Sequence, residues 1–345
     1  MATTIAVLSQ KGGTGKTTLV RSLVDVLQRV GLDTLAIDSD PQGNLSDYFD
    51  VDPEAEPTLA DVLAGRARAV DAVNRSVIPA NLVLAESELM LAGKIGRELT
   101  LRNALREVKR RHDFILIDCP PTLGLLTVNA LVAADYALLS TAAEYFSLQG
   151  VEQALEVTEL ARESLNPDLG VLGIVLNIAD MRTSHARRTL EALRGYFGEK
   201  VCSTVISRSI AYAESAERAV PILEHRPRRG LDYVDLAVEL LGRLDMAEPR
   251  RRVEKLRDRL IDELRTEAEV EAEEDEIHDS ITRPPEPVAE PEREPVVEPE
   301  PEEPAAEPEP EEPAADAGFG PSRGGLGEGV KPWRPVPPGP DDRAA

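Results

Sequence analysis

The sequence predicts a doubly wound α/β domain with a mainly parallel sheet over residues 1–248. Short apolar runs alternate with segments of helical period through about the first 245 residues. The apolar runs are nearly continuous, as is typical of parallel strands that helices cover on both faces. A glycine-rich stretch follows the first run and opens a helical segment. Ligands of such folds bind beyond the carboxyl ends of the strands, so functional residues are expected there.

Seven short runs rich in Ile, Leu and Val are the predicted strands. They lie at residues 3–9, 33–38, 80–85, 113–118, 136–141, 170–177 and 200–206. Helical segments separate most of these runs, and parallel neighbours need such crossover connections. The pattern therefore predicts one sheet between two layers of helices.

The helices are predicted from apolar residues that recur every three or four positions. In the segment at 16–30 these residues fall on one face, and they are Leu19, Leu23, Val26, Leu27 and Val30. Further helices are predicted at residues 99–110, 123–133, 147–164, 183–197 and 230–245. Each has an apolar side with which to cover the sheet.

Residues 249–276 form a predicted amphipathic helix that is charged over most of its surface. Val253, Leu256, Leu260 and Leu264 follow one another at spacings of three and four, which places them in one narrow apolar stripe. Such a stripe packs on the domain, pairs with a second copy, or lies on a membrane. Because the flanking sequence turns strongly acidic, packing or self-pairing is favoured over membrane binding.

Residues 277–345 are predicted to be a disordered, acidic, proline-rich tail. Of the formal net charge of −24, residues 266–345 carry −18, from 24 acidic and 6 basic residues. Seventeen of the 27 prolines lie between residues 284 and 340. Such a segment buries too little apolar surface to offset the entropy of ordering. Trp333 within it is either an incidental aromatic residue or part of a short docking peptide.

Cysteine usage and hydropathy exclude several classes of protein. Cys119 and Cys202 lie far apart, so neither a disulfide framework nor a cysteine metal site is predicted. No apolar run approaches the ~18 residues of a membrane span, and the first residues lack a signal-peptide pattern. These features predict a soluble, cytoplasmic protein.

The glycine-rich stretch SQKGGTGKTT, residues 9–18, has the pattern of a phosphate-binding loop. Gly12, Gly13 and Gly15 let the backbone curl so that its N–H groups face phosphates at the start of a helix. Lys16 is expected to reach the β and γ phosphates, and Thr17 to place its hydroxyl on Mg²⁺. A glycine turn that merely caps a helix explains less, because the preceding strand and the following helix are both in place.

Three aspartates end predicted strands where that site would be completed. Asp118 ends the run FILID and is suited to orient the water shell of a bound metal. Asp38 ends the run AID, and Asp40 follows it by two residues. The two side chains therefore lie on one face if the chain stays extended. A lone Asp at a strand end often caps a helix, but two acidic strand ends beside a phosphate loop favour a metal-dependent nucleotide site.

These motifs resemble the ParA/MinD group of P-loop ATPases, which has the deviant phosphate loop KGGxGK[ST]. The chain is most similar to the ParA/Soj partitioning ATPases over about residues 3–245. The segments that carry the resemblance, in the family's order, are KGGTGKTT, DSDPQGN, IDCPPTLGLLTVNAL, EYFSLQG and ISRSIAYAESAERAVPILEHRP. The resemblance implies a P-loop NTPase fold, with ATP and Mg²⁺ as cofactors.

The resemblance also implies a role for each matched residue. Lys11 is the signature lysine, which reaches the ATP of the partner subunit in a nucleotide-sandwich homodimer. Asp40 positions or activates the hydrolytic water with support from Asp38, and both Asp40 and Asp118 act on the metal through water. The residues expected to bind the nucleotide are Gly12, Gly13, Thr14, Gly15, Lys16, Thr17, Thr18, Asn177 and Ser207, with the last two near adenine. Ser207 stands where the family usually has a proline.

Partners follow from the resemblance as well. Members of this branch bind DNA without sequence preference in the ATP state, and a ParB-like partner stimulates their low basal ATPase activity. A nucleoid-associated protein that partitions chromosomes or plasmids is therefore expected. The basic residues that are candidates for DNA contact are Arg182, Arg187, Arg188, Arg208, Arg226, Arg228 and Arg229.

Other functions of the same loop remain alternatives. A ParA relative can position another cargo, and a MinD-like regulator binds membrane through a basic C-terminal helix, whereas this chain ends PDDRAA. An iron–sulfur protein, a tyrosine kinase or an ATP-dependent amidase is less favoured, because cysteines, late tyrosines or a further catalytic domain would be needed. The acidic tail is expected either to compete with DNA for the arginines or to extend a partner-binding site.

Overall fold

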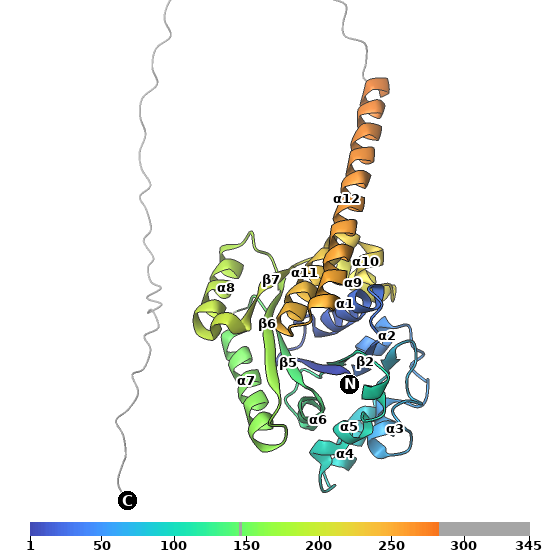
Figure 1. Ribbon diagram of the computed structural model, residues 1–345, viewed down its shortest axis with the longest axis vertical. Coiled ribbons are helices and arrows are strands. Elements are labelled where there is room, and N and C mark those ends of the chain that lie inside the picture. The colour runs from blue at the N-terminus through green and yellow to red at the C-terminus, as the bar shows by residue number, and fades with distance from the viewer. Residues whose placement is uncertain (145–146, 283–345) are drawn as a thin grey trace, which may run out of the picture. The chain divides into compact units, whose positions relative to one another are not determined.

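The computed structural model describes residues 1–144 and 147–282, with side chains described as far as residue 266. A sheet forms its centre, with helices around it (Figure 1). The sheet has seven strands in the order β3-β2-β4-β1-β5-β6-β7, and every neighbouring pair is parallel. The strands are β1 (Thr3–Leu8), β2 (Thr34–Asp38), β3 (Val77–Ile78), β4 (Phe114–Asp118), β5 (Tyr136–Ala142), β6 (Gly170–Ala179) and β7 (Val201–Ser207). The predicted doubly wound α/β fold is confirmed.

Two layers of helices cover the sheet, each with its own apolar core. One core takes residues from α3 (Leu59–Ala64), α4 (Val83–Leu91), α5 (Thr100–Ala104), α6 (Leu125–Ala133), α7 (Ser147–Ser164) and α8 (Ser184–Phe197). The other takes residues from α1 (Lys16–Arg29), α2 (Asn44–Tyr48), α9 (Ala211–Glu217), α10 (Ile222–His225), α11 (Pro227–Arg243) and α12 (Ala247–Thr282). Three short 3₁₀ turns are η1 (Arg97–Leu99), η2 (Val108–Arg110) and η3 (Gly198–Lys200).

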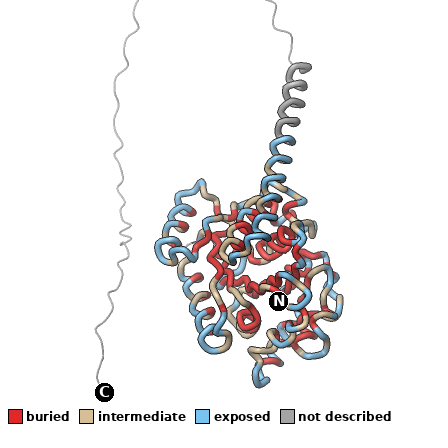
Figure 2. The backbone as a smooth tube through the Cα atoms, viewed as in Figure 1, coloured by how far each residue is buried: buried red, intermediate tan, exposed pale blue. Residues whose placement is uncertain are grey.

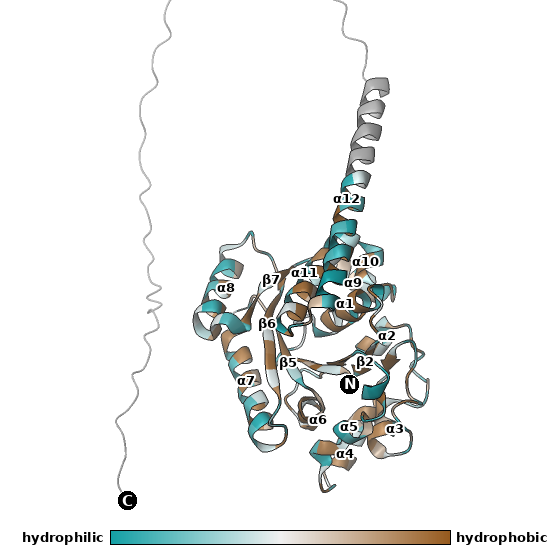
Figure 3. Ribbon diagram, in the orientation of Figure 1, coloured by the Kyte–Doolittle hydropathy of each residue, from teal (hydrophilic) through white to brown (hydrophobic). Residues whose placement is uncertain are grey.

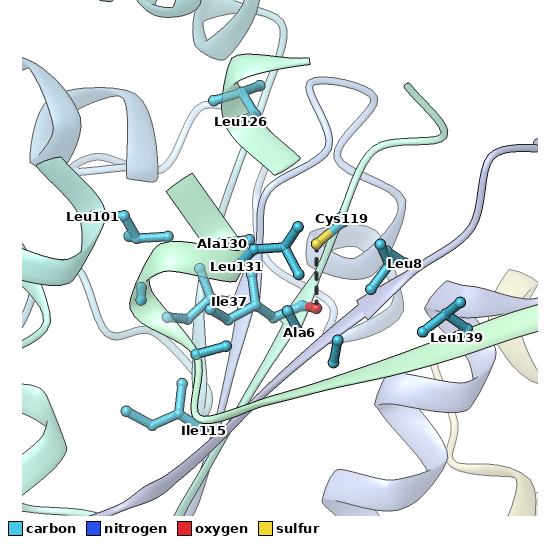
Figure 4. Packing of buried hydrophobic residues seen from close by; sticks show 14 of the residues in the cluster. Ala6, Leu8, Ile37, Leu101, Ile115, Cys119, Leu126, Ala130, Leu131 and Leu139 are labelled. Carbon is cyan, nitrogen blue, oxygen red and sulfur yellow. Dashed lines mark hydrogen bonds between the residues drawn. The ribbon is translucent and has the colours of Figure 1, made fainter. Parts of the chain in front are cut away.

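Alternate residues of the central strand β1 belong to the two different cores. Ala6 and Leu8 belong to one core and Ile5 and Val7 to the other, because successive side chains of a strand point to opposite faces. The tube in Figure 2 is accordingly buried along the sheet and exposed at the outer helices. Figure 4 shows the α6 side of the sheet, where Leu131 packs with strand residues such as Ala6 and Leu8.

The third predicted strand is wrong. Residues 80–85 do not extend; instead β3 is limited to Val77–Ile78 and the run LVLA enters helix α4. Asn81 starts the turn, because its side chain accepts a hydrogen bond from the Val83 N–H at 3.1 Å. The buried residues of α4 are Leu84, Ser87 and Leu91, at helical spacing. A short apolar run is compatible with a strand and with a helix, and the run alone does not distinguish the two. The prediction of a strand here was therefore wrong.

The helix predicted at 99–110 is broken into η1, α5 and η2. Leu101, Leu105 and Val108 are nevertheless fully buried, at spacings of four and three. The apolar period was therefore interpreted correctly, whereas the backbone tightens into 3₁₀ turns on either side of α5. Four further short helices, α2, α3, α9 and α10, lie in stretches where no helix was predicted.

The amphipathic stripe of α12 packs on the domain. Val253, Leu256 and Leu260 are at most 8% exposed and join the same core as α11. Figure 3 colours most of the other residues in this part of α12 as hydrophilic. Of the three arrangements expected for this stripe, packing on the domain is thus confirmed for these residues. The helix continues to Thr282, six residues beyond the predicted end, and the remainder of the predicted tail, including Trp333, lies outside the described residues.

Candidate nucleotide site

The phosphate-binding loop joins β1 to α1, and side chains of β5 and β6 form hydrogen bonds with its carbonyl groups. Gly13 and Gly15 have φ of +76° and +77°, a left-handed conformation that favours glycine. Ser140 at the end of β5 donates to the Thr14 carbonyl at 2.8 Å, and Asn177 of β6 donates to the Gly15 carbonyl at 3.2 Å. Because the carbonyls are tied to the sheet, the loop's N–H groups and the start of α1 are available to an anion.

Among the glycines of the loop, Gly15 is the position where a side chain would cost most. A Cβ atom built there lies 2.6 Å from Asn177 Nδ2, and the positive φ adds strain. Gly15→Ala is expected to lower the free energy of unfolding of the nucleotide-free protein by about 2 kcal/mol, measured by urea denaturation. Gly12→Ala is the matched control, since a Cβ at Gly12 meets nothing within 4 Å and φ there is not positive. Equal stabilities of the two variants would contradict this account.

Lys16 lies at the floor of the loop. The residue is 7% exposed, and its ammonium donates to Ser9 Oγ at 3.2 Å. The Ser9 hydroxyl in turn lies 2.9 Å from Thr14 Oγ1. A lysine ammonium that donates to one hydroxyl, and that forms no ion pair with a carboxylate in the described residues, is suited to donate hydrogen bonds to a phosphate.

Asp118 ends β4 and lies beside Thr17. The Thr17 hydroxyl donates to Asp118 Oδ2 at 2.7 Å, while Oδ1 is buried with no hydrogen-bond partner in the described part of the chain. Burial raises the pKa of the Asp118 carboxyl to about 7, against the opposing effects of Thr17 and Lys16. A buried, unpartnered carboxylate oxygen next to a threonine hydroxyl is a set of hard oxygen donors that fits Mg²⁺ and its water shell.

Asp38 is directly opposite Asp118 in the register of β2 and β4. It is fully buried and accepts hydrogen bonds from Ser46 N at 2.9 Å and Ser46 Oγ at 2.7 Å. Burial, and then the nearby Asp118, raise the pKa of Asp38 to about 8. Two adjacent buried carboxyls thus form a place where divalent positive charge is favoured.

A hydrogen bond to the Asp38 carboxylate positions the backbone of Asp40. Its backbone N–H donates to Asp38 Oδ1 at 3.1 Å, and its own Oδ1 accepts from Gln42 N at 3.0 Å. Asp40 is partly exposed and lines one cleft together with the whole glycine loop from Gly12 to Thr18. Its carboxylate can therefore reach a water or metal ligand in that cleft, which the buried Asp38 cannot.

The affinity for Mg²⁺ is expected to depend on pH. Binding of Mg²⁺ favours ionised Asp118, whereas a proton occupies this carboxyl as the pH falls through about 7. Below that pH each bound metal must release a proton, so its binding weakens as the pH falls. With ADP present, the dissociation constant for Mg²⁺ is expected to be roughly tenfold higher at pH 6 than at pH 8, measured by calorimetry. Asp118→Asn should flatten this dependence, and a wild-type affinity that is constant over this range would contradict it.

Lys11 lies outside this cleft. Its side chain is 61% exposed and forms an ion pair with Glu144, which follows β5. Both residues line a small separate hollow with Ser147 and Val151 of α7. The two lysines of the loop therefore have opposite environments, one buried under the site and one at the surface.

The two residues predicted to lie near adenine are placed differently from each other. Asn177 is fully buried at the end of β6, and its amide is engaged by Gly15, Ser140 and the backbone of Ile178. Ser207 ends β7, and its N–H donates to Asp232 Oδ2 at 2.8 Å. Neither lines the glycine-loop cleft, whereas Ile178 does. Their contact with adenine stays a prediction.

The candidate DNA-binding arginines are exposed and fall into two groups. Arg182 is 91% exposed and is bonded through both Nε and Nη2 to Asp180. The hydrogen bonds from Arg182 lower the pKa of Asp180 to about 2, and Arg208 contributes to this shift more weakly. Arg187 and Arg188 follow on α8. The second group is Arg226, Arg228 and Arg229, at the start of α11.

Sequence reasoning missed several residues that hold the site together. Ser9, Ser46 and Ser140 each bond to the loop or to its aspartates, and Tyr48 lines the cleft. Ser9 and Ser140 lie at the carboxyl ends of β1 and β5, so the rule that revealed the aspartates applies to them as well. For Ser46 and Tyr48 in α2 no such signal exists, because that helix was not predicted.

Comparison with known proteins gives a consistent family. Residues 2–171 match the model of a family described as an AAA domain. The chain is 39% identical over 249 residues to the sporulation initiation inhibitor protein Soj of Bacillus subtilis, covering 70% of this chain and 98% of Soj. It is 35% identical over 258 residues to the chromosome partitioning protein ParA of Myxococcus xanthus, covering 72% of this chain and 91% of that protein.

A solved structure is similar in fold and sequence. Cobyrinic acid a,c-diamide synthase from Mycobacterium smegmatis, with bound ADP and magnesium, has a TM-score of 0.58 and 34% identity. The match covers 65% of this chain and 95% of that one. Separately, none of the helices in the described residues is long and apolar enough to cross a membrane.

Proposed function

Because the chain belongs to the ParA/Soj family of P-loop ATPases, we propose that it is a dimerising ATPase that partitions chromosomes or plasmids. At the coarser level it is a partitioning or positioning ATPase, with ATP and Mg²⁺ as its cofactors. The ATP form binds nonspecific DNA, and a ParB-like partner stimulates a low basal rate of hydrolysis to ADP and phosphate. The protein acts in the cytoplasm, on the nucleoid.

The different burial of Lys11 and Lys16 is the observation that supports the proposed dimer. Lys16 is buried beneath the chain's own loop, while Lys11 is exposed and outside that cleft. A γ-phosphate has negative charge that one lysine and Mg²⁺ do not fully neutralise as the bond breaks. Lys11 supplies the missing cation to the nucleotide of a second copy. The Glu144 carboxylate holds Lys11 until the second copy's phosphates replace it.

Hydrolysis relies on the aspartates at the strand ends. Asp40 orients the attacking water, and Asp38 fixes the Asp40 backbone through its hydrogen bond. Thr17, whose hydroxyl lies against Asp118, would hold Mg²⁺ through that hydroxyl, and Asp118 would act on the bound metal through water. The ATPase domain comprises residues 1–248, and α12 is an appended helix.

DNA binding is assigned to the exposed arginines, above all Arg182 and Arg208. Each is expected to contact a backbone phosphate, which requires Arg182 to exchange its pairing with Asp180. Arg182→Gln is expected to weaken binding to duplex DNA about tenfold in the ATP state and to reduce the salt dependence by about one phosphate contact. Arg162→Gln on α7, an exposed arginine paired with Glu159, is the control. Equal losses in the two variants would contradict the assignment.

The function is tested by ATP hydrolysis in four mixtures: the protein alone, with nonspecific DNA, with a candidate partner from a neighbouring gene, and with both. Low basal turnover that rises with partner and DNA together supports a partitioning ATPase. Turnover that neither addition changes would contradict it. ATP-dependent sedimentation with liposomes would instead favour a MinD-like regulator, and stimulation by an unrelated partner would favour another cargo.

A further inference from the structure

A second cleft lies next to the nucleotide site and is lined by three arginines from three segments. They are Arg21 of α1, Arg75 just before β3 and Arg218 just after α9. Gln28 and Phe49 contribute to the same walls. We call this cleft the arginine pocket. None of the roles described above uses it.

Arg21 is held in a fixed position at the pocket. It is 9% exposed, and its Nε donates to the Tyr48 carbonyl at 3.3 Å. The guanidinium carbon lies 4.2 Å from the centroid of the Phe49 ring and 5.7 Å from that of Tyr48. These contacts occupy one edge and one face of the guanidinium, and its Nη groups have no hydrogen-bond partner in the described residues. A buried cation that lacks a paired anion is costly, so the arrangement favours an anionic ligand.

The carboxylates around the pocket already have partners. Asp25 is bonded to Arg29 at 2.8 Å, and Asp50 forms an ion pair with Arg75. The Asp25 carboxylate also attracts the Arg21 guanidinium electrostatically without forming an ion pair with it, and Glu224 of α10 does so more weakly. No carboxylate in the described part of the chain forms an ion pair with Arg21 or Arg218. Two guanidinium groups that line the cleft are therefore available to a ligand.

The backbone of the pocket is strained where its walls meet. Asp50, Arg75 and Ala219 have φ of 55°, 45° and 52°, in the left-handed region that side chains with a Cβ rarely adopt. Such a backbone conformation is strained and persists only where the surroundings enforce it. Three such residues at one cleft show that packing holds these segments in place around it.

We propose that the arginine pocket binds a phosphate group. A guanidinium presents donors in a planar fork that matches two oxygens of a phosphate, and Arg21 and Arg218 offer two such forks. The amide of Gln28 adds a neutral donor on the same wall. The phosphate comes either from the backbone of bound DNA or from a small free phosphate compound, and the chemistry of recognition is the same.

The pocket shares a wall with the nucleotide cleft. Tyr48 and Glu217 line the nucleotide cleft, while their chain neighbours Phe49 and Arg218 line the arginine pocket. The wall is tied by a hydrogen bond between the hydroxyls of Tyr48 and Ser215. Arg21 also follows Thr17 by four residues on α1, so the two side chains lie on one face of the helix. A phosphate in this pocket is one helical turn from the residue expected to bind Mg²⁺.

The proposal is tested with the full chain saturated with ADP and Mg²⁺, so that the nucleotide cleft is filled. Inorganic phosphate is titrated at low salt and followed by calorimetry. Arg218→Gln changes an exposed side chain and is expected to weaken phosphate binding at least fivefold without changing ADP affinity. Arg21→Lys keeps the buried charge but removes the fork, and the same loss is expected. Arg162→Gln is the control for the loss of one surface charge.

A second arm measures binding of a short duplex DNA in the presence of a non-hydrolysable ATP analogue. If Arg218→Gln weakens DNA binding in parallel with phosphate binding, the ligand is a DNA backbone phosphate. If phosphate binding alone is lost, the ligand is a small phosphate compound. The proposal is overturned if wild type binds no inorganic phosphate up to about 10 mM and Arg218→Gln leaves DNA affinity unchanged. It is equally overturned if both pocket variants behave like Arg162→Gln in both arms. Neither arm requires hydrolysis, and the arm with inorganic phosphate does not require dimer formation.

Discussion

Lys11→Ala is expected to abolish ATP-dependent dimerisation and to lower the rate of ATP hydrolysis by at least about 100-fold. A cation supplied in trans to a γ-phosphate contributes about 10³ to 10⁵ in rate in comparable nucleotide hydrolases. Binding of ATP by the monomer should change little, because Lys11 lies outside the cleft and Lys16 remains beneath the loop. This separation of binding from turnover distinguishes a trans-acting lysine from one that binds its own nucleotide.

The measurement combines sedimentation velocity with a non-hydrolysable ATP analogue and steady-state phosphate release. Lys255→Ala, an exposed lysine of α12, is the matched control and should resemble wild type in both. Lys16→Ala provides the opposite pattern, since it should lose ATP affinity itself. A Lys11→Ala protein that forms dimers and hydrolyses ATP normally would reject the trans-lysine mechanism for this chain.

The nucleotide site was predicted from sequence because its chemistry is local and repeats at strand ends. The glycine loop is one continuous segment, and Asp38 and Asp118 each end an apolar run that is recognisable on its own. Parallel pairing then brings the two aspartates into register without any further information. The same reasoning correctly placed six of the seven strands.

The contacts that support the site could not be predicted in this way. Ser140 bonds to the loop across 126 positions of sequence, and Asn177 across 162. Nothing in a single sequence specifies such pairs, because they depend on how the whole sheet is assembled. The prediction of the third strand was wrong for a related reason. Its apolar run is compatible with a strand or a helix, and the turn at Asn81 and the burial of Leu84, neither of which the run itself specifies, favour the helix.

Asp40→Ala is expected to reduce hydrolysis at least about 100-fold while ATP binding and dimerisation persist, giving a DNA-bound dimer that does not dissociate. The reason is that Asp40 reaches the cleft but makes no hydrogen bond to the loop or to Lys16 in the described residues. The loss of a group that orients the attacking water affects the transition state and leaves ground-state binding intact. Asp47→Ala is the control, because Asp47 lines the same cleft from α2.

Asp40→Asn separates the charge of Asp40 from its structural role. Asn retains a side-chain oxygen that can accept the hydrogen bond from Gln42 N, so the local turn is preserved while the carboxylate is removed. If the carboxylate orients or activates water, Asp40→Asn should hydrolyse ATP as slowly as Asp40→Ala. If the turn alone matters, Asp40→Asn should recover most of the wild-type rate, and the catalytic assignment of Asp40 would be wrong. Phosphate release in a single turnover, with ATP prebound, makes the comparison independent of affinity.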